Sequence, residues 1–440
     1  MDEQHPPFEA SDKVVDSPTM IYPENFFSTI YDITRAIFRH LPIRSVDSCS
    51  LVCQSWLQIS RRTKQSRRTI HTLTYPSNPC LPTTICSNLL NDFDQSIISF
   101  INNQLWSMPT LALVVSTNLL ANKGFYSSAN SPPSNKFGEK TSLTRRTERF
   151  NISQALIRHL NKSCKILMVA ADGIIASDEQ NQSNEIESGL KINLTKKHTF
   201  RIEFDLDDAI GILFLPNFSP NILGVYPFEI PTNAQISSDM SRSDLHRFLG
   251  SVPDDVPIRC VIFFFVQRQS YAVDCIKKLL EYYPSQIAIL GGFVDEINYD
   301  DRQIHPNPMS YDACGIVITG DQTHLHIGEV LLEHNIQTRE EIHDKLKELK
   351  TVEQNSYLSF AFQISCIARG LNHYNGEQNV ECSEFRKIFP HTPLIGVFSN
   401  GELGHDYLPH RQLSSSRQQQ TGRNLFRGYS TVFTLISLHK

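Results

Sequence analysis

The sequence predicts a mixed α/β (α+β) protein in which a small all-helical unit precedes a large region of strands and helices. Two observations predict this fold class. Between residues 30 and 64 apolar residues recur at helical spacing. From residue 69 onward, short strand-like runs mix with amphipathic helical segments, as in sheets covered by helices. The 440 residues allow about three domains of ~150 residues each.

The helical unit shows its periodicity most clearly at Ile30, Ile33, Ile37, Phe38 and Leu41, which fall on one face of a helix. Pro42 ends that helix, and Ser45 is expected to cap a second helix. A third helical piece is predicted from Gln54 to about Lys64. A unit this small buries little apolar surface, so a partner or a neighbouring domain must cover part of it.

The remaining chain alternates between strand and helix patterns. The expected helices are 88–106, 150–160, 271–282 and 339–350. The expected strands are 69–75, 110–116, 165–171, 199–204, 210–215, 258–266, 286–290, 315–319, 324–331, 359–367, 393–398 and 431–438.

The predicted organisation has four parts. These are a disordered tail at 1–23, the helical unit at 24–68, an α/β domain at 85–250 and a second domain at 251–440. Within the third part, two polar segments without periodicity, 127–146 and 178–188, are expected to be flexible loops.

Composition excludes several classes of function. The chain carries 41 basic and 46 acidic residues, so no global field favours nucleic acid or an anionic membrane. The ten cysteines form no Cys-x-x-Cys pair, which indicates a reducing compartment. With no secretory signal and no long apolar window, we expect a cytoplasmic and nuclear location. The basic run 61–68 could be a localisation signal, although a solvated helix end explains it as well.

Leu41-Pro42 and the run Leu51-Val52-Cys53-Gln54-Ser55-Trp56 resemble the F-box family, in which a helix ends in Leu-Pro and a Trp follows Leu-Val-Cys by three residues. The sequence departs from the family pattern at Thr29-Ile30 and Asp47. The resemblance implies binding to a Skp-type adaptor and, through it, to cullin and RING subunits. The residues it assigns to adaptor binding are Ile33, Ile37, Leu41, Pro42, Val46, Leu51, Val52 and Trp56. Alternatively, the three helices pack on the chain's own downstream domain.

The downstream region resembles the FIST family, named for F-box and intracellular signal transduction proteins. The motifs are Phe360-Ala361-Phe362, Cys366-Ile367-Ala368-Arg369-Gly370 and Asn400-Gly401-Glu402-Leu403-Gly404, with Gly291-Gly292 after a strand. The resemblance implies FIST N-like and FIST C-like domains at 85–250 and 251–440. The candidate ligand or substrate surface comprises Gly291, Gly292, Arg369, Asn400, Gly401 and Glu402. The glycines could instead serve turns.

Together, these resemblances imply a non-catalytic substrate receptor of an SCF-type (Skp-cullin-F-box) ubiquitin ligase, which recruits target proteins for ubiquitination and proteasomal degradation. The alternative is a FIST-domain sensor of a small ligand with a degenerate F-box. An enzyme is disfavoured, because the sequence has no nucleophile elbow, Walker loop or metalloprotease helix. No cofactor or metal is expected, since His324-x-His326 has no further ligand at matching spacing.

Overall fold

The computed structural model describes residues 26–75, 89–117, 152–177, 183–187, 209–232, 234, 236–237, 239–266, 270–283, 287–300, 311–370, 373–408 and 425–440. The chain divides into two compact units, one of residues 1–41 and 45–66, and one of residues 42–44 and 67–440. The expected tail at 1–23, the loop at 127–146 and the strand at 199–204 lie outside the described residues.

The smaller unit, called here the helical unit, consists of α1 (Phe26–Phe38), α2 (Ile43–Cys49) and α3 (Gln54–Ser66). The three predicted helices are therefore present. The start of the second differs from the prediction: α2 begins at Ile43, so Ser45 lies inside the helix and does not cap it. Pro42 explains the difference, because its fixed φ suits the residue at the very start of a helix.

The first of three sheets in the larger unit has the order β1-β6-β2-β3-β10. Only the β2–β3 pair in it is parallel. The strands are β1 (His71–Tyr75), β6 (Ile210–Pro216), β2 (Pro109–Thr117), β3 (Lys165–Ala171) and β10 (Glu296–Asp300). Helices α4 (Leu89–Asn103) and α6 (Ile152–His159) pack on one face through a shared apolar cluster.

The second sheet has the order β16-β15-β9-β8-β11-β7, and its β8–β9 pair is parallel. The strands are β16 (Phe426–Arg427), β15 (Glu402–Leu403), β9 (Ala288–Phe293), β8 (Ile258–Phe265), β11 (Tyr311–Thr319) and β7 (Gly224–Pro231). The nearby helices are α7 (Pro220–Leu223), α8 (Arg242–Phe248) and α9 (Ser270–Tyr282). Of these, α8 and α9 share an apolar cluster with the sheet.

The third sheet has the order β12-β17-β13-β14-β4-β5, and its β13–β14 pair is parallel. The strands are β12 (Leu325–Leu332), β17 (Thr431–Leu438), β13 (Leu358–Cys366), β14 (Leu394–Ser399), β4 (Gly173–Ser177) and β5 (Ser183–Glu187). Helices α10 (Arg339–Lys347), α11 (Lys350–Glu353) and α12 (Val380–Ile388) cover one face, and the 3-10 turn η1 (Ile367–Arg369) follows β13.

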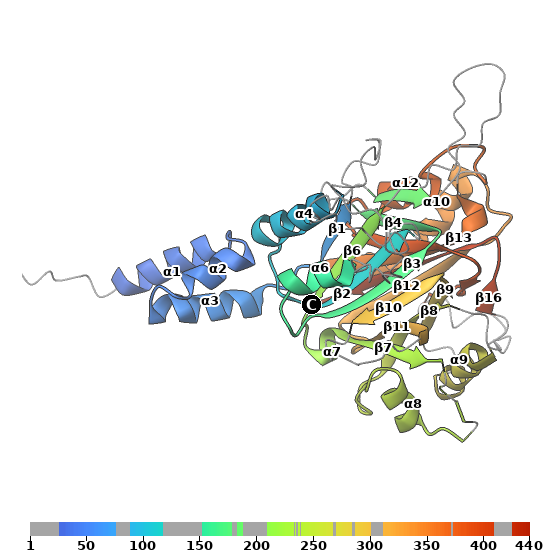
Figure 1. The fold of residues 1–440 in the computed structure, drawn as a ribbon, viewed down its shortest axis with the longest axis horizontal. Helices are drawn as coiled ribbons and strands as arrows, with labels where there is room; N and C mark the ends of the chain where they lie inside the picture. Colours follow the sequence, from blue (N-terminus) through green and yellow to red (C-terminus); the bar gives the residue numbers. More distant parts are fainter. Residues whose placement is uncertain are drawn as a thin grey trace, which may run out of the picture. The chain divides into compact units, whose positions relative to one another are not determined.

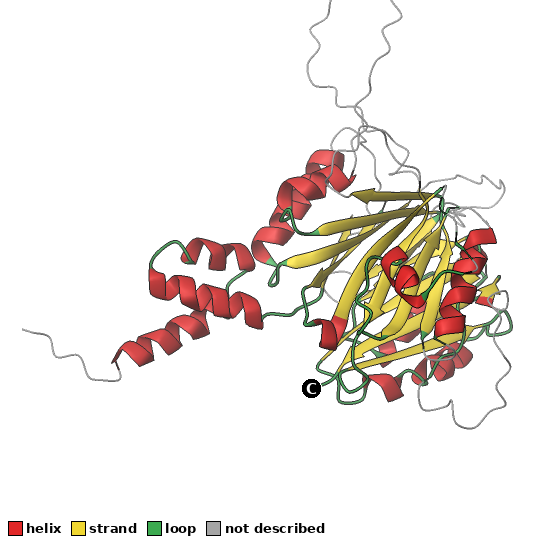
Figure 2. Ribbon diagram, turned by 90° about the horizontal axis from the view of Figure 1, so that it is seen from below, coloured by secondary structure: helices red, strands yellow, loops and turns green. Residues whose placement is uncertain are grey.

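Alternation along the strands explains how the layers stack. In β8, Cys260, Ile262 and Phe264 face a core shared by all three sheets, whereas Val261, Phe263 and Phe265 face the helices. Strands buried on both faces read as continuous apolar runs, which is what the sequence shows there. The strands accordingly lie inside with helices around them (Figures 1 and 2). The predicted class, short N-terminal helices followed by mixed α/β sheets, is confirmed.

Several strands join sheets across the boundary expected at residue 250. β4 pairs with β14, and β10 pairs with β3, so each half of the larger unit supplies strands to the other. The structure accordingly groups 67–440 as one unit, in contrast to the two separate domains expected. Residues 183–187 form β5 inside the segment 178–188 expected to be a loop. The predicted helix 339–350 is divided between α10 and α11.

Candidate functional site

The helical unit has a very small interior. Phe38, Val46 and Ile59 are buried, each 1% exposed or less. Trp56 closes this core from α3, with its ring edge-to-face on Phe38 at 5.2 Å between centroids. Polar contacts add to it, since Arg62 donates to the Tyr31 hydroxyl at 2.8 Å and Lys64 pairs with Asp47. Three buried apolar side chains are few for the core of three helices.

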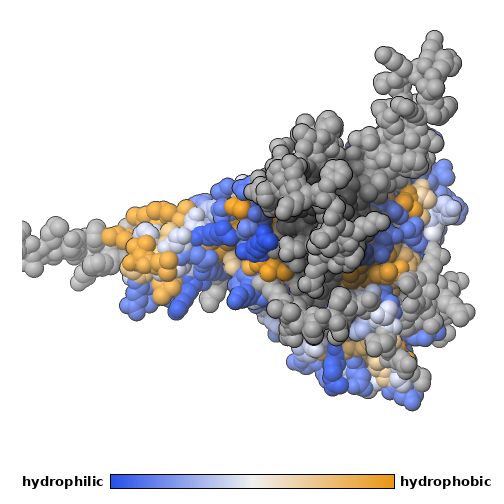
Figure 3. Space-filling view, viewed as in Figure 1, coloured by the Kyte–Doolittle hydropathy of each residue, from blue (hydrophilic) through white to orange (hydrophobic). Residues whose placement is uncertain are grey.

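The outside of the same unit is unusually apolar. Five aliphatic side chains stand in solvent, and Figure 3 shows apolar colour gathered over these helices. Their exposed fractions are Ile30 44%, Ile33 55%, Ile37 54%, Leu51 87% and Val52 63%. A concentration of exposed aliphatic groups on so small a unit is typical of a surface that a partner protein covers. We call these five residues the aliphatic face.

The eight residues assigned to adaptor binding do not share one environment. Ile33, Ile37, Leu51 and Val52 are exposed and belong to the aliphatic face. Leu41, Pro42 and Trp56 are half-buried. Val46 is fully enclosed, so its side chain holds the helices together and does not reach a partner.

The candidate ligand surface of the larger unit gathers where β9 and β14 end. Phe293 donates its backbone N–H to Gly401 at 3.1 Å, and Asn400 donates to Phe293 at 3.0 Å. In the ladder, Glu402 pairs with Gly292, and Leu403 pairs with Gly291. Backbone contacts therefore bring Gly291, Gly292, Asn400, Gly401 and Glu402 together, and their role, with Arg369, as a ligand or substrate surface stays a prediction.

The glycines in this group allow close packing between chain segments. A methyl group at Gly291 would overlap the carbonyl oxygen of Phe263, and one at Gly292 would overlap the side chain of Ser399. Gly401 has φ +123°, which an L side chain rarely adopts. These contacts are with protein, so they support the alternative role of the glycines in turns and strand packing.

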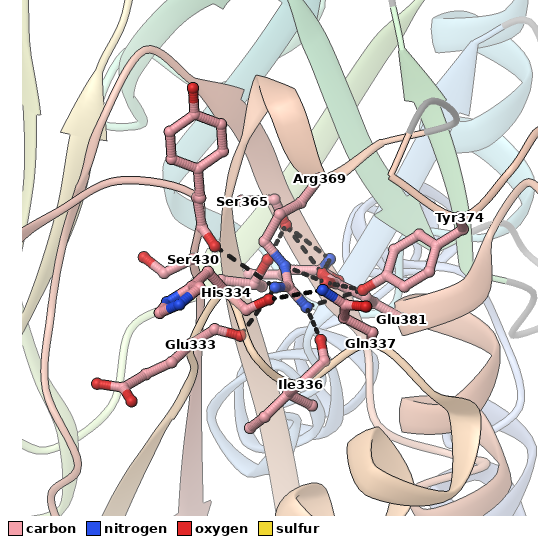
Figure 4. A network of polar contacts seen from close by, with 12 residues as sticks. Glu333, His334, Ile336, Gln337, Ser365, Arg369, Tyr374, Glu381 and Ser430 are labelled. Atoms are coloured by element: carbon pink, nitrogen blue, oxygen red, sulfur yellow. Dashed lines mark hydrogen bonds and ion pairs between the residues drawn. The ribbon is translucent and has the colours of Figure 1, made fainter.

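Arg369 is buried at the carboxyl end of β13 and is 1% exposed (Figure 4). Its Nε donates to Glu381 Oε1 at 2.8 Å, and its two Nη atoms donate to three backbone carbonyls and a hydroxyl. These acceptors are Glu333 O at 3.0 Å, Ile336 O at 3.0 Å, Tyr429 O at 3.4 Å and the Tyr374 hydroxyl at 2.8 Å. With five donors and five bonds, the guanidinium has none left for a ligand.

Glu381 completes this network from α12. Its Oε1 also accepts from the Tyr374 hydroxyl at 2.6 Å, and its Oε2 accepts from Gln363 at 3.1 Å. Burial acts to lower the pKa of Arg369, but the Glu381 carboxylate and Tyr374 outweigh it, so the pKa is raised and the charge is kept. The pair is an internal brace that ties α12 to the two loops around residues 336 and 429.

Glu402 lies beside this network and is also fully buried. Its Oε2 accepts from the Ser430 hydroxyl at 2.8 Å and the Ser430 N–H at 3.3 Å. Burial raises its pKa to about 7, although hydrogen bonds from Ser430 and the Cys366 thiol act in the opposite direction. Arg369 donates to the Tyr429 carbonyl, and Glu402 accepts from the neighbouring Ser430. Residues 429–430 therefore connect Glu402 to the Arg369–Glu381 pair.

The sequence did not predict the partners of the two buried candidates. Glu381 and Tyr374 bond to Arg369, and Ser430 bonds to Glu402. The helical spacing of the apolar residues Val380, Phe385 and Ile388 was a signal that could have predicted a helix packed on a sheet, with Glu381 beside its buried face.

Asn400 differs from its neighbours, because its side-chain amide is exposed and donates to Asp172 at 3.1 Å. Among the described residues, no three His, Cys, Asp or Glu side chains are grouped as a ready metal-ligand set.

Comparisons with known proteins agree with both parts of this architecture. Residues 31–66 match the F-box domain, and residues 307–405 match the FIST C domain. The chain thus carries an N-terminal F-box domain and a C-terminal FIST C domain. The FIST N-like assignment of 85–250 stays a prediction.

Distant similarity extends over almost the whole chain. F-box only protein 22 of Homo sapiens is 22% identical over 430 residues, which is 93% of each chain. F-box only protein 22 of Pongo abelii is 23% identical over 433 residues, again 93% of each chain.

Among the residues that the structure describes, no helix is long and apolar enough to cross a lipid bilayer.

Proposed function

We propose that this protein is the substrate-recognition subunit of a Skp-cullin-F-box ubiquitin ligase. The observation that carries the proposal is the aliphatic face, five exposed aliphatic side chains on a domain that matches the F-box. An F-box domain implies binding to a Skp-type adaptor, and this face is where we place the contact. Ile33, Ile37, Leu51 and Val52 make it directly, while Leu41, Pro42 and Trp56 support it from half-buried positions.

The energetics favour docking at this face. Burying apolar surface contributes about 25 cal/mol per Å², so covering five aliphatic side chains gives a gross gain of several kcal/mol. Part of that gain offsets the freedom lost on association. The small core of Phe38, Val46 and Ile59 gains as well, since a bound partner stabilises the folded unit by mass action.

The FIST-containing region would then select target proteins. The receptor needs no catalytic residue, because holding a target's lysines near the conjugating enzyme raises their effective concentration. Targets ubiquitinated in this way would pass to the proteasome, in the cytoplasm and nucleus. Asn400, whose side chain is exposed, stays a candidate for target contact.

The alternative, a sensor of small ligands, has less support. The two charged residues expected to contact a ligand, Arg369 and Glu402, are buried and hydrogen-bonded to other residues of the chain. Opening either one would break several hydrogen bonds before any ligand could form new ones. We therefore favour a protein-recognition role for the FIST-containing region.

Binding of the full-length protein to a purified Skp-type adaptor, measured by isothermal titration calorimetry, tests the proposal. The double variant Ile37→Glu, Leu51→Glu places two charges on exposed positions, so it should fold normally and bind at least about 100-fold more weakly. Gln58→Glu, also exposed but outside the aliphatic face, is the matched control and should bind as the wild type does. Tight binding by the double variant would contradict the proposal.

A further inference from the structure

The helical unit has a positive charge within a chain that is negative overall. Residues 26–66 contain six basic and two acidic residues, whereas the whole chain has 41 basic and 46 acidic ones. One of the two acids, Asp47, is paired with Lys64. The other basic side chains therefore give this small unit a local field that favours an anionic partner.

Three arginines gather on one side of the unit. Arg35 and Arg39 are exposed and stand four residues apart, so they lie in one row along α1 and its end. Tyr31, four residues before Arg35, continues that row. The exposed Arg62 of α3 joins it, because its guanidinium donates to the Tyr31 hydroxyl at 2.8 Å and lies 5.9 Å from the centre of that ring. We call Arg35, Arg39 and Arg62 the basic row.

The basic row and the aliphatic face lie on different sides of α1. Ile33 is two residues before Arg35, and Ile37 is two residues before Arg39. At 3.6 residues per turn, side chains two residues apart point about 200° away from each other. An adaptor that covers the aliphatic face would therefore leave the basic row open.

The charge of the basic row is not neutralised nearby. Among the residues that the structure describes, no carboxylate forms an ion pair with any of the three arginines. Asp32, one turn before Arg35, is the one acidic residue in the sequence of α1. Arginine presents paired donors that match a carboxylate, so acidic side chains are the partner that this row fits.

The segment before α1 has the matching composition. Residues 1–25 contain six acidic residues and one basic residue, Lys13, and they lie outside the described residues. The segment joins α1 at Phe26, and α1 has 13 residues, so the helix is about 20 Å long at ~1.5 Å per residue. About six residues of extended chain cover that distance. Direct attachment also gives the segment an effective concentration on the order of 1 mM, so individually weak ion pairs are sufficient to hold it.

We propose that residues 1–25 dock on the basic row, with their carboxylates against Arg35, Arg39 and Arg62. The docked segment would cover the side of α1 that the adaptor leaves open, so this contact does not depend on adaptor binding. Exposed ion pairs are screened by salt, and docking should therefore weaken as ionic strength rises.

Cleavage of the full-length protein by a lysine-specific endopeptidase tests the docking. Lys13 is the one lysine in residues 1–25, so the rate of cutting there, followed by mass spectrometry, reports how firmly the segment is held. Lys64 lies in α3, and cutting there requires the helical unit to open. Slow cleavage at Lys64 therefore shows that a variant still folds.

Neutralising the basic row should release the segment. The triple variant Arg35→Gln, Arg39→Gln, Arg62→Gln should speed cutting at Lys13 by at least about 5-fold at low salt, and the wild type should approach that rate in about 0.5 M sodium chloride. Arg247→Gln, at an exposed position of α8, is the matched control and should cut as the wild type does. Equal rates for the wild type and the triple variant, with Lys64 protected in both, would overturn the proposal.

Exchanging the charges makes the test specific. Glu9→Arg, Asp16→Arg should also speed cutting at Lys13, and combining this pair with Arg35→Glu, Arg39→Glu should restore slow cutting, because opposite charges then face each other again. The protease does not cut after arginine, so the new residues add no site. Rates that the combination fails to restore would overturn the assignment of the basic row. Rates that rise when the wild type is diluted would mean that a second copy supplies the segment, which would overturn docking within one chain.

Discussion

The helical unit and the larger unit distribute polar and apolar groups in opposite ways. The helical unit encloses three apolar side chains and leaves five aliphatic ones in solvent. The larger unit buries charged and acidic side chains, among them Arg369, Glu381 and Glu402, and bonds them to other parts of the chain. The first arrangement favours contact with a partner, whereas the second ties parts of one chain to each other. Stability should therefore depend on different residues in each unit.

Removing the buried arginine should have the largest effect. Arg369→Met leaves the Glu381 carboxylate buried without its cation, so the free energy of unfolding should fall by about 3–5 kcal/mol. The double variant Arg369→Met, Glu381→Met should recover part of that loss, because both charges are then absent. Urea unfolding measures both, with the exposed Arg247→Met as control. A loss below about 1 kcal/mol would show that the brace is unimportant.

Truncating the small core should affect the helical unit alone. Phe38→Ala leaves a cavity beside Val46 and Trp56, and such truncations cost about 3 kcal/mol or more. Because α1–α3 form a separate unit, hydrogen exchange should lose protection there and keep it in β13. Ile37→Ala, at an exposed position, serves as the control. Equal loss of protection in β13 would mean that the units unfold together.

Glu402 should give the larger unit a pH dependence near neutrality. Its pKa of about 7, against an ordinary 4.5, means that the folded protein keeps this proton after the unfolded chain has lost it. Its stabilising contribution is complete below pH 4.5 and is lost as pH rises through about 7. Relative to Glu402→Gln, the wild type should lose about 2–3 kcal/mol over this range. Parallel pH profiles for the two proteins would contradict this.

The smallest predicted effect concerns the start of α10. Thr338 accepts from the Glu341 N–H at 3.2 Å, and Glu341 accepts from the Thr338 N–H at 2.9 Å, which forms a capping box. Thr338→Ala should cost about 1 kcal/mol in thermal or urea unfolding. Thr351→Ala, whose exposed hydroxyl bonds only to the preceding turn, is the comparison and should cost less than about 0.5 kcal/mol. Equal losses of unfolding free energy in the two variants would show that Thr338 does not stabilise α10 as a cap.

Sequence periodicity predicted helices and strands correctly where a single apolar pattern ran through the whole element. The helices of the smaller unit and strands such as β8 and β13 were predicted because their apolar residues follow a single spacing or a continuous run. It failed for β7 and β10, whose polar residues and prolines hide the pattern until they pair with β11 and β3. Which strands share a sheet is a matter of long-range pairing, so the interleaving of the two halves could not be predicted.

The candidate site was also only partly predictable from the sequence. Gly291, Gly292, Asn400 and Glu402 lie together because β15, which follows β14 in the chain, pairs with β9. The sequence offered these residues as candidates but did not predict that pairing. It gave no warning that Arg369 would be occupied by Glu381, since that contact depends on how α12 packs. Exposure was equally hidden in the helical unit, where Val46 and Ile37 follow one motif but face in opposite directions.

The place of β17 in the third sheet has a consequence for how the protein is made. β17 follows all the other strands in the sequence, yet it lies between β12 and β13 and bonds to both. On a ribosome, β12 and β13 emerge before β17, and their edges stay unpaired until the strand between them is made. Such late, non-local closure is slow and favours association with other chains or with chaperones. A chain cut before residue 431 would keep these edges open and become a substrate for quality control.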